Sequence, residues 1–285
     1  MSLAGGRIAV VPLTVASANV NGLRAAVRRG LHRWIDSVQP DVLTLQEVRC
    51  PDDLVSDLLG EGWHLVHSEC RDRGRAGVAV ASRRAIRSPR TQIGHRAFDG
   101  AGRWAEAELT TGDGRGLTVV SAYVHTGDAT DERRMAQKHH FVELLTQRLE
   151  ELRASGLHVL LTGDLNISHK EVDLRNWRGN RGRAGFLPQE RAHLDRLFDQ
   201  LGWVDLGRRF GGWGPGPYTW WSYRGRAYDN DVGWRIDYQV ASPDLAATAK
   251  DAFVDRAPTH PERWSDHAPL VATFDLDLAG EEDSP

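Results

Sequence analysis

A short apolar run that ends in a polar tetrapeptide constrains the fold of this chain more than any other stretch. Residues 158–162 are mostly apolar and lie between Gly156 and Gly163, a pattern typical of a buried strand. Gly163 allows a sharp turn, which predicts that the strand ends there, and Asp164 and Asn166 follow. Because residues i and i+2 of a strand face the same side, this spacing predicts a carboxylate and an amide side by side at the edge of a sheet. Such edges carry the sites of many layered α/β proteins.

The same pair has an ordinary structural interpretation, because Asp and Asn are common turn and capping residues. Polar side chains recur, however, at the ends of the other strands that the sequence predicts: Asn19, Asn21, Glu47, Tyr123, Asp237, Asp266 and His267. Together they indicate one site at the rim of a sheet. Its oxygen donors suit Mg²⁺, with Mn²⁺ as a substitute, better than Zn²⁺.

Composition excludes several classes of protein. The chain is 40% hydrophobic and 26% charged, which is ordinary for a globular protein, and no apolar run reaches the length of a membrane span. Residues 1–15 lack the pattern of a signal peptide, so we expect a cytoplasmic protein. Two cysteines are too few for a disulfide framework or a cysteine zinc site. The net charge of −3 does not by itself indicate a nucleic-acid partner.

The periodicity of apolar residues predicts an α/β chain. Helices are predicted at residues 23–38, 52–59, 131–154 and 190–200, and Gly-containing loops at 176–186 and 211–216. Strands are predicted at residues 13–18, 42–45, 63–67, 77–82, 104–110, 117–123, 158–162, 218–223, 235–240 and 270–276. We expect one domain over residues 1–278, with two similar halves that join near Ser155 and Gly156. Residues 279–285 are expected to form a disordered acidic tail.

Five motifs occur in a recognisable order. They are NVNGLRA at 19–25, LQEVR at 45–49, GDLN at 163–166, GWRIDY at 233–238 and SDHAP at 265–269. In this order they resemble the exonuclease III family of AP endonucleases, within the endonuclease/exonuclease/phosphatase superfamily, and the resemblance runs from Leu13 to Phe274. The third and fifth motifs mark only the superfamily, which includes deoxyribonuclease I, sphingomyelinases and inositol phosphatases. The first and fourth are more specific to the DNA-repair branch.

The resemblance implies a four-layer α/β sandwich of the deoxyribonuclease I type, with two face-to-face β-sheets flanked by helices. It implies a Mg²⁺-dependent DNA-repair nuclease that hydrolyses phosphodiester bonds 5′ of abasic sites, acts as a 3′→5′ exodeoxyribonuclease or trims 3′ ends. Its partner would be double-stranded DNA with abasic sites or 3′ ends, and the protein would be a monomer. Two alternatives are another phosphoesterase of the superfamily and a DNA-binding protein without activity.

The resemblance also implies a role for each polar residue. Glu47 would be the principal Mg²⁺ ligand, and the further candidate ligands are Asn19, Asn21, Asp164, Asn166, Asp266 and His267. Asp164 would orient or deprotonate the attacking water, while Asn166 and Tyr123 would hold phosphate oxygens. His267, oriented by Asp237, would stabilise the charge that develops on the phosphoryl group. The base is either Asp164 or the pair of Asp237 and His267.

Each of three site residues has its own alternative interpretation. Glu47 would be a solvated charge at a strand end, Asp237 an ion-pair partner of Arg235, and His267 a turn residue before Pro269. Their joint occurrence in the order of the family argues against all three alternatives. The chain also departs from the family after Tyr123. Where the family often has Val-Pro-Asn-Gly, residues 124–127 are Val-His-Thr-Gly, which leaves His125 or Thr126 to replace the amide.

The substrate side is predicted from aromatic and basic residues. The resemblance implies that Trp220, Trp234 and Ile236 line a flat apolar pocket, which would accept an extruded abasic deoxyribose and exclude a whole base. The alternative is that these side chains belong to the core. A Gly-rich loop offers a contact for the phosphate backbone through Arg178, Arg181 and Arg183, with a solvated loop as the alternative.

Overall fold

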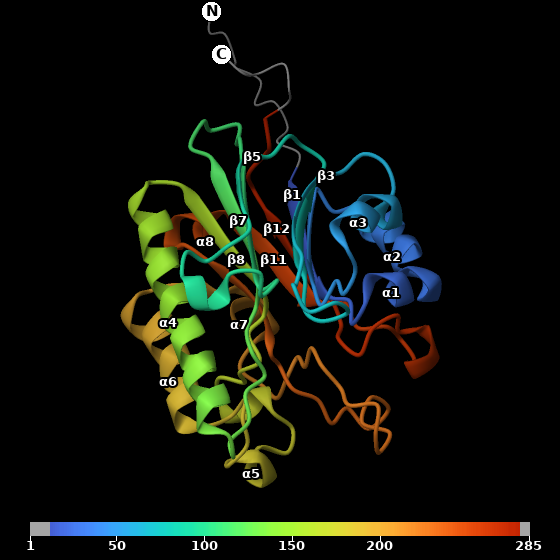
Figure 1. Cartoon of the computed structure of the whole chain (residues 1–285), viewed down its shortest axis with the longest axis vertical. Coiled ribbons are helices and arrows are strands. Elements are labelled where there is room, and N and C mark those ends of the chain that lie inside the picture. Colours follow the sequence, from blue (N-terminus) through green and yellow to red (C-terminus); the bar gives the residue numbers. More distant parts are fainter. Residues whose placement is uncertain (1–11, 280–285) are drawn as a thin grey trace, which may run out of the picture.

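Two six-stranded sheets form the centre of the protein, whose structure is a computed structural model that describes residues 12–279. The first sheet has the strand order β11 (Ala249–Val254), β12 (Leu270–Phe274), β1 (Leu13–Asn19), β2 (Val42–Gln46), β4 (Val78–Ser82) and β3 (His64–Ser68). The second has the order β5 (Arg87–Arg90), β6 (Trp104–Leu109), β7 (Leu117–Tyr123), β8 (His158–Asp164), β10 (Asp237–Ala241) and β9 (Val204–Asp205). The sheets pack face to face in the middle of Figure 1.

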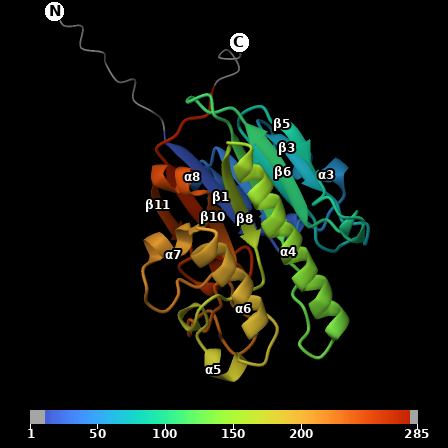
Figure 2. The same cartoon turned by 90° about the vertical axis from the view of Figure 1, so that its left-hand side faces the viewer.

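Helices cover the outer face of each sheet. The first sheet carries α1 (Leu23–Arg29), α2 (Leu31–Val38) and α3 (Asp52–Leu59), and the second carries α4 (Glu132–Ala154) and α6 (Pro188–Asp195) (Figures 1 and 2). α7 (Leu206–Gly211) contacts β10 and β11, α8 (Pro243–Thr248) contacts β8 and β10, and α5 (Trp177–Asn180) is a single turn. The short turns are η1 (Arg96–Phe98), η2 (Glu171–Asp173), η3 (Arg196–Gln200) and η4 (His260–Glu262). Within residues 12–279, every helix is too short or too polar to span a membrane.

Three apolar cores hold these layers together. The middle core lies between the sheets and includes Val15, Val80 and Leu160, all fully buried. The other two lie between each sheet and its helices. The helix predicted at 131–154 is confirmed as α4, and it buries one apolar face that includes Met135, Val142, Leu145, Leu149 and Leu152. Two sheets between two helical layers are the predicted four-layer α/β sandwich.

Parallel strand pairs bring the polar strand ends to one edge. β1 pairs in parallel with β2, and β7 with β8, so that Asn19 lies opposite Gln46 and Tyr123 lies opposite Asp164. The antiparallel β10 then places Asp237 opposite Asp164. The edge predicted from strand ends therefore contains residues from both sheets.

Glycines explain two errors in the predicted elements. The helix predicted at 23–38 is two helices, because Gly30 adopts a left-handed conformation with φ of 116° and ends α1. Gly163 was predicted to end its strand, but β8 continues to Asp164. A Cβ at Gly163 would lie 2.0 Å from the carbonyl oxygen of Ala122, so glycine there allows close strand pairing.

Tertiary contacts explain the other differences. The strand predicted at 218–223 is wrong, since only Trp220 makes isolated bridges, to Trp234 and His267. The predicted loop at 176–186 contains α5, and the helix predicted at 190–200 starts at Pro188 and continues into the π-helical η3. The missed elements include β5, β9, β11, α7 and α8. Each half of the chain contributes to both sheets, so the division near Ser155 does not separate them. Ala279 donates to Thr110 O at 3.0 Å, and the rest of the predicted tail lies outside the described residues.

Candidate active site

An amide links two carboxylates at the floor of the site. Asn19 Nδ2, at the end of β1, donates to Glu47 Oε1 and to Asp164 Oδ2, each at 3.0 Å. Glu47 follows β2 with a φ of 51° and is only 8% exposed, so it is not a solvated rim charge. Arg49 forms an ion pair with its second oxygen, Oε2. The two carboxylates are therefore held close together by defined donors, although they repel each other.

A histidine and a third carboxylate complete this cluster. His267 Nδ1 lies 2.8 Å from Asp237 Oδ2, and His267 Nε2 lies 3.9 Å from Asp164 Oδ2. Ser265 Oγ accepts from the backbone N–H of His267 and donates to Asn19 O, which fixes the loop against β1. Asp237 is thus a partner of His267, as predicted.

Arg235 has other partners, which removes the alternative interpretation of Asp237. Arg235 Nε lies 2.7 Å from Asp173 Oδ1, and Arg235 Nη2 lies 2.8 Å from Asp205 Oδ2. Arg208 also pairs with Asp173. Arg235 N also donates to Asp173 O at 2.8 Å, so these buried pairs hold the backbone just before β10.

Burial and charge shift the protonation of the cluster. Burial, followed by the neighbouring Asp237 carboxylate, raises the pKa of Asp164 from 3.8 to about 8. Burial lowers the pKa of His267, but Asp237 and Asp164 raise it more, to a net value of about 10. Arg49 balances Glu47 and His267 balances Asp237, so ionisation of Asp164 adds a negative charge that has no partner. A bound cation would balance this charge.

The residues present fit a divalent metal ion. Potential ligand atoms of Glu47, Asp164 and His267 lie within 4.8 Å of one another, and all three side chains are buried. The amide nitrogen of Asn19 donates to both carboxylates, so this atom orients the ligands and does not itself bind the metal. Asp266 lies next to the cluster, where its Oδ1 accepts from Asn21 Nδ2 at 2.8 Å. Glu47 and Asp164 therefore offer the most direct oxygen donors, with His267 beside them.

Tyr123 and Asn166 stand above the carboxylates. Burial and the carboxylates of Glu47 and Asp164 raise the pKa of the Tyr123 hydroxyl, which keeps it protonated as a donor. The guanidinium of Arg103 lies 4.6 Å from the centre of the Tyr123 ring. The backbone N–H of Asn166 donates to Asp164 Oδ1 at 2.8 Å, and its side chain donates to Val124 O at 2.9 Å. These contacts place the predicted phosphate-holding residues beside Asp164.

The residues that replace the amide of the family after Tyr123 have different positions. Thr126 is exposed and lines the groove above the cluster. His125 instead packs against Phe98 and Phe141, with ring centroids 5.6 and 5.5 Å away, and does not line the groove. Of the two, Thr126 therefore lies where a phosphate contact is expected.

A groove of about 1150 Å³ lies above the cluster. One wall is aromatic: Trp220 and Trp234 meet edge to face with ring centroids 6.3 Å apart, and Ile236 lies beside them. Trp220 Nε1 also donates to Asp266 Oδ2 at 3.1 Å, which joins this wall to the polar cluster. Both tryptophans are half-buried, unlike Trp221, which is 1% exposed in a separate small apolar cluster with Tyr218 and Tyr228.

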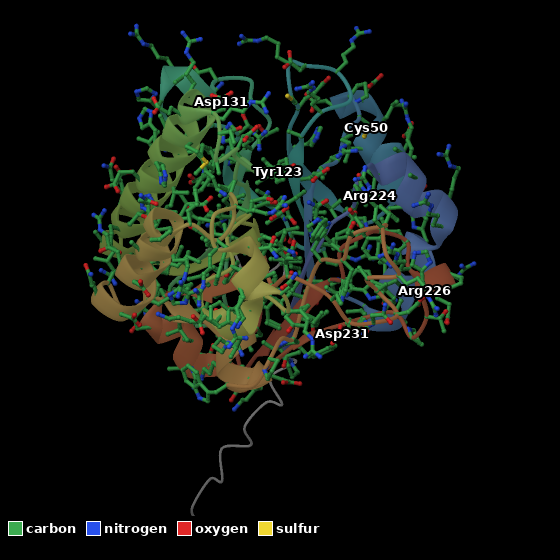
Figure 3. All side chains as sticks on the ribbon, turned by 90° about the horizontal axis from the view of Figure 1, so that it is seen from below. Cys50, Tyr123, Asp131, Arg224, Arg226 and Asp231 are labelled. Carbon is green, nitrogen blue, oxygen red and sulfur yellow. The ribbon has the colours of Figure 1, made fainter. Side chains whose placement is uncertain are left out.

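The predicted basic loop reaches the groove through one of its three arginines. Arg183 lines the groove, whereas Arg178 and Arg181 lie 4.4 Å from the centre of the Trp177 ring on and after α5. A second loop, residues 222–227, brings Tyr223 and Arg224 to the groove. Figure 3, seen from below, shows Tyr123 near the middle of the molecule and Arg224 and Arg226 on that loop.

Several groove or cluster residues lay outside the sequence predictions, among them Arg49, Arg103, Tyr223 and Arg224. Arg49 ends the LQEVR motif, so its ion pair with Glu47 had a sequence signal. Arg103 had none, because the many arginines of this chain hide any single functional one.

The comparisons with known proteins agree with this geometry. The sequence profile of the Endonuclease/Exonuclease/phosphatase family matches residues 16–267, so the chain belongs to this family. It is 34% identical to the exodeoxyribonuclease of Bacillus subtilis over 93% of this chain and 100% of that protein. It is 32% identical to exodeoxyribonuclease III of Haemophilus influenzae over 90% of this chain and 98% of that one.

Solved structures support the same fold. The 3′-5′ exonuclease from Neisseria meningitidis matches with a TM-score of 0.81 and 28% identity, over 92% of this chain and 100% of that one. An AP endonuclease from Archaeoglobus fulgidus matches with a TM-score of 0.80 and 27% identity, over 92% of this chain and 99% of that one. These relatives are thus exonucleases and an AP endonuclease, and the two with solved structures share the fold of this chain.

Proposed function

We propose that the protein is a Mg²⁺-dependent DNA-repair nuclease that hydrolyses phosphodiester bonds 5′ of abasic sites and also acts on 3′ ends. One observation supports this most: the cluster of Glu47, Asp164 and His267 lies at the floor of a groove with an aromatic wall. An apolar wall would add little to the binding of a small soluble phosphate ester, but it can pack against an extruded abasic sugar. The sequence also predicts a cytoplasmic monomer, which stays a prediction.

The proposed roles follow from the contacts. A divalent cation held by Glu47 and Asp164 would supply the positive charge that neutralises phosphate oxygens during attack. Asp237 beneath His267 Nδ1 favours the imidazolium form, so His267 offers a charged N–H at Nε2 to the phosphoryl group. Asp164 then remains as the group that orients or deprotonates the attacking water.

Tyr123 and Asn166 would hold the phosphate while this occurs. Both line the groove beside Asp164. Each carries a neutral O–H or N–H group, which can donate a hydrogen bond to a phosphate oxygen. Arg183 and Arg224 also line the groove, where they would contact the DNA backbone. Positioning and charge neutralisation together account for the reaction that we propose.

One side-by-side assay tests the proposal. Purified protein is given an abasic duplex, an intact duplex with recessed 3′ ends, and an inositol phosphate, each with Mg²⁺, with Mn²⁺ and with excess chelator. We expect cleavage 5′ of the abasic site and release of 3′ nucleotides, both abolished by the chelator. Hydrolysis of the inositol phosphate alone would favour another phosphoesterase. DNA binding without any hydrolysis would favour a binding protein.

A further inference from the structure

Lys138 is a buried cation that contacts three separate segments behind the groove. It lies on the inner face of α4, and its side chain is fully buried. Its Nζ donates to Thr126 O at 3.0 Å, to Asn166 O at 2.8 Å and to Glu190 Oε1. An ammonium group has three N–H donors, so these three acceptors satisfy it completely.

The residue type is informative at this position. Only three of the 36 Lys and Arg residues are Lys, and the side chains of Lys170 and Lys250 are 47% and 59% exposed. In a chain that otherwise uses Arg, the buried position holds a compact group with donors in tetrahedral directions. A planar guanidinium is larger and could not reach these three acceptors from one atom.

Glu190 extends the contact to a fourth segment. Its Oε2 accepts from Leu187 N at 2.9 Å, which is an ordinary capping contact at the start of α6. The same oxygen also accepts from Gly185 N at 2.7 Å, and Gly185 lies outside the helix. Both oxygens of the carboxylate are thus used, and one of them holds a loop that lines the groove.

Gly185, which Glu190 holds, packs against both the catalytic rim and the aromatic wall. Its φ is +92°, and a Cβ there would lie 3.1 Å from Trp234 Cζ3 and 3.2 Å from Asn166 O. Its carbonyl accepts from Ser168 N at 2.8 Å. The backbone of Gly185 therefore packs directly between Trp234 and Asn166, and a small shift of this loop would displace both.

We infer that the buried pair of Lys138 and Glu190 is a positioning element that sets Asn166 and the Trp234 wall relative to each other. The groove is lined by Thr126, Asn166, Gly185 and Trp234. The pair forms hydrogen bonds with the backbone of the first three. The inference rests on the proposed function, because Asn166 and Trp234 carry phosphate binding and sugar selection there. Neither Lys138 nor Glu190 touches the substrate in this assignment.

The test uses a neutral double variant, Lys138→Met with Glu190→Gln. Met has a similar length, and Gln keeps an oxygen that can accept from Gly185 and Leu187, so no buried charge is left unpaired. Lys138→Arg keeps the charge but changes its geometry. The matched control is Arg148→Met with Glu106→Gln, which removes an ion pair that joins the same helix, α4, to β6. Neither control residue lines the groove.

Single-turnover rates are measured on abasic and intact duplexes, and DNA affinity is measured in chelator, where cleavage stops. For the double variant we expect the rate on abasic duplex to fall by up to about 10²-fold, since misplacement by about 1 Å costs this much, with little change in affinity. The preference for abasic over intact duplex should fall as well. The separate variant Lys138→Arg should also show a lower preference than wild type. The control variant should lose thermal stability but keep the wild-type rate and preference.

Two results overturn the inference. One is a double variant that behaves like the control in rate and preference, because the pair is then only a stabilising contact. The other is full wild-type behaviour of Lys138→Arg, because charge alone would then suffice. In both cases the wild-type protein still cleaves abasic duplex, whereas failure of the wild type to cleave any duplex would refute the proposed function itself.

Discussion

His267 and Asp237 form a buried contact that joins the two sheets beneath the groove. Nδ1 of His267 lies 2.8 Å from Oδ2 of Asp237, and the two side chains are 5% and 4% exposed. Asp237 starts β10 of the second sheet, while His267 precedes β12 of the first. The contact therefore fixes both the orientation and the charge of the imidazole.

Asp237→Asn should lower the pKa of His267. Burial disfavours the imidazolium, and the Asp237 carboxylate is the main group that raises the pKa again, to about 10. In metal-free wild-type protein, the NMR signals of this ring should stay constant between about pH 6 and about pH 8, and in the variant they should titrate in this range. Equal titration of both proteins would show that Asp237 does not hold the proton.

Mg²⁺ should stabilise the protein more at about pH 8 than at about pH 5. Burial and Asp237 raise the pKa of Asp164 from 3.8 in the unfolded chain to about 8, so the folded state binds this proton more tightly. The contribution of Asp164 to stability without metal therefore falls as the pH rises from about 4 to about 8. A cation beside Asp164 removes this cost. Thermal unfolding at both pH values, with and without Mg²⁺, measures the effect.

Glu47→Gln is the variant that tests the metal site itself. It keeps the shape of the side chain but removes the charge of one of the two carboxylates that accept from the Asn19 amide. We expect the affinity for Mn²⁺, measured by calorimetry, to fall by at least about tenfold, because hard cations depend on ligand charge. Unchanged affinity would place the metal elsewhere.

Asp164→Asn should separate binding from hydrolysis. The amide keeps the size of the carboxylate and can still accept from the Asn166 N–H, but it cannot take a proton. Turnover of abasic duplex should fall by about 10²- to 10⁴-fold, the usual contribution of a general base, while DNA affinity in chelator stays close to that of wild type. An equal loss of both would assign Asp164 a structural role.

The sequence predicted the rim residues because strand periodicity and motif order are local features. Asn19, Glu47, Asp164 and His267 stand next to recognisable strands, and the structure brings their side chains together. The edges of the sheets were harder to predict. β9 has only two residues, and β5 reads Arg-Ser-Pro-Arg, a sequence without apolar alternation. Such strands form because a neighbouring strand is already in place.

Long-range contacts account for what the sequence did not reveal in the site. Residues 218–223 have the aromatic composition of a strand, yet Trp220 makes only isolated bridges there, to Trp234 and His267. Thr219 Oγ1 accepts from the backbone of Ile236 and Asp237. The contact of Lys138 with Glu190 spans 52 residues. No spacing rule reports such a pair, because its members lie on different helices.

Trp234→Ala should weaken discrimination between abasic and intact duplexes more than it slows the hydrolytic step. Trp234 is half-buried, contacts Gly185 and Trp220, and faces the groove, while Asp164 and His267 lie on the floor below. Removing the indole opens a wall that excludes a whole base, so the ratio of rate constants on the two duplexes should fall by about 10- to 100-fold. Rates on both substrates and the melting temperature, measured for wild type and variant, check this result. If the ratio is unchanged while the protein stays folded, Trp234 only supports the loop of Gly185, and the base-excluding wall must come from other groove residues.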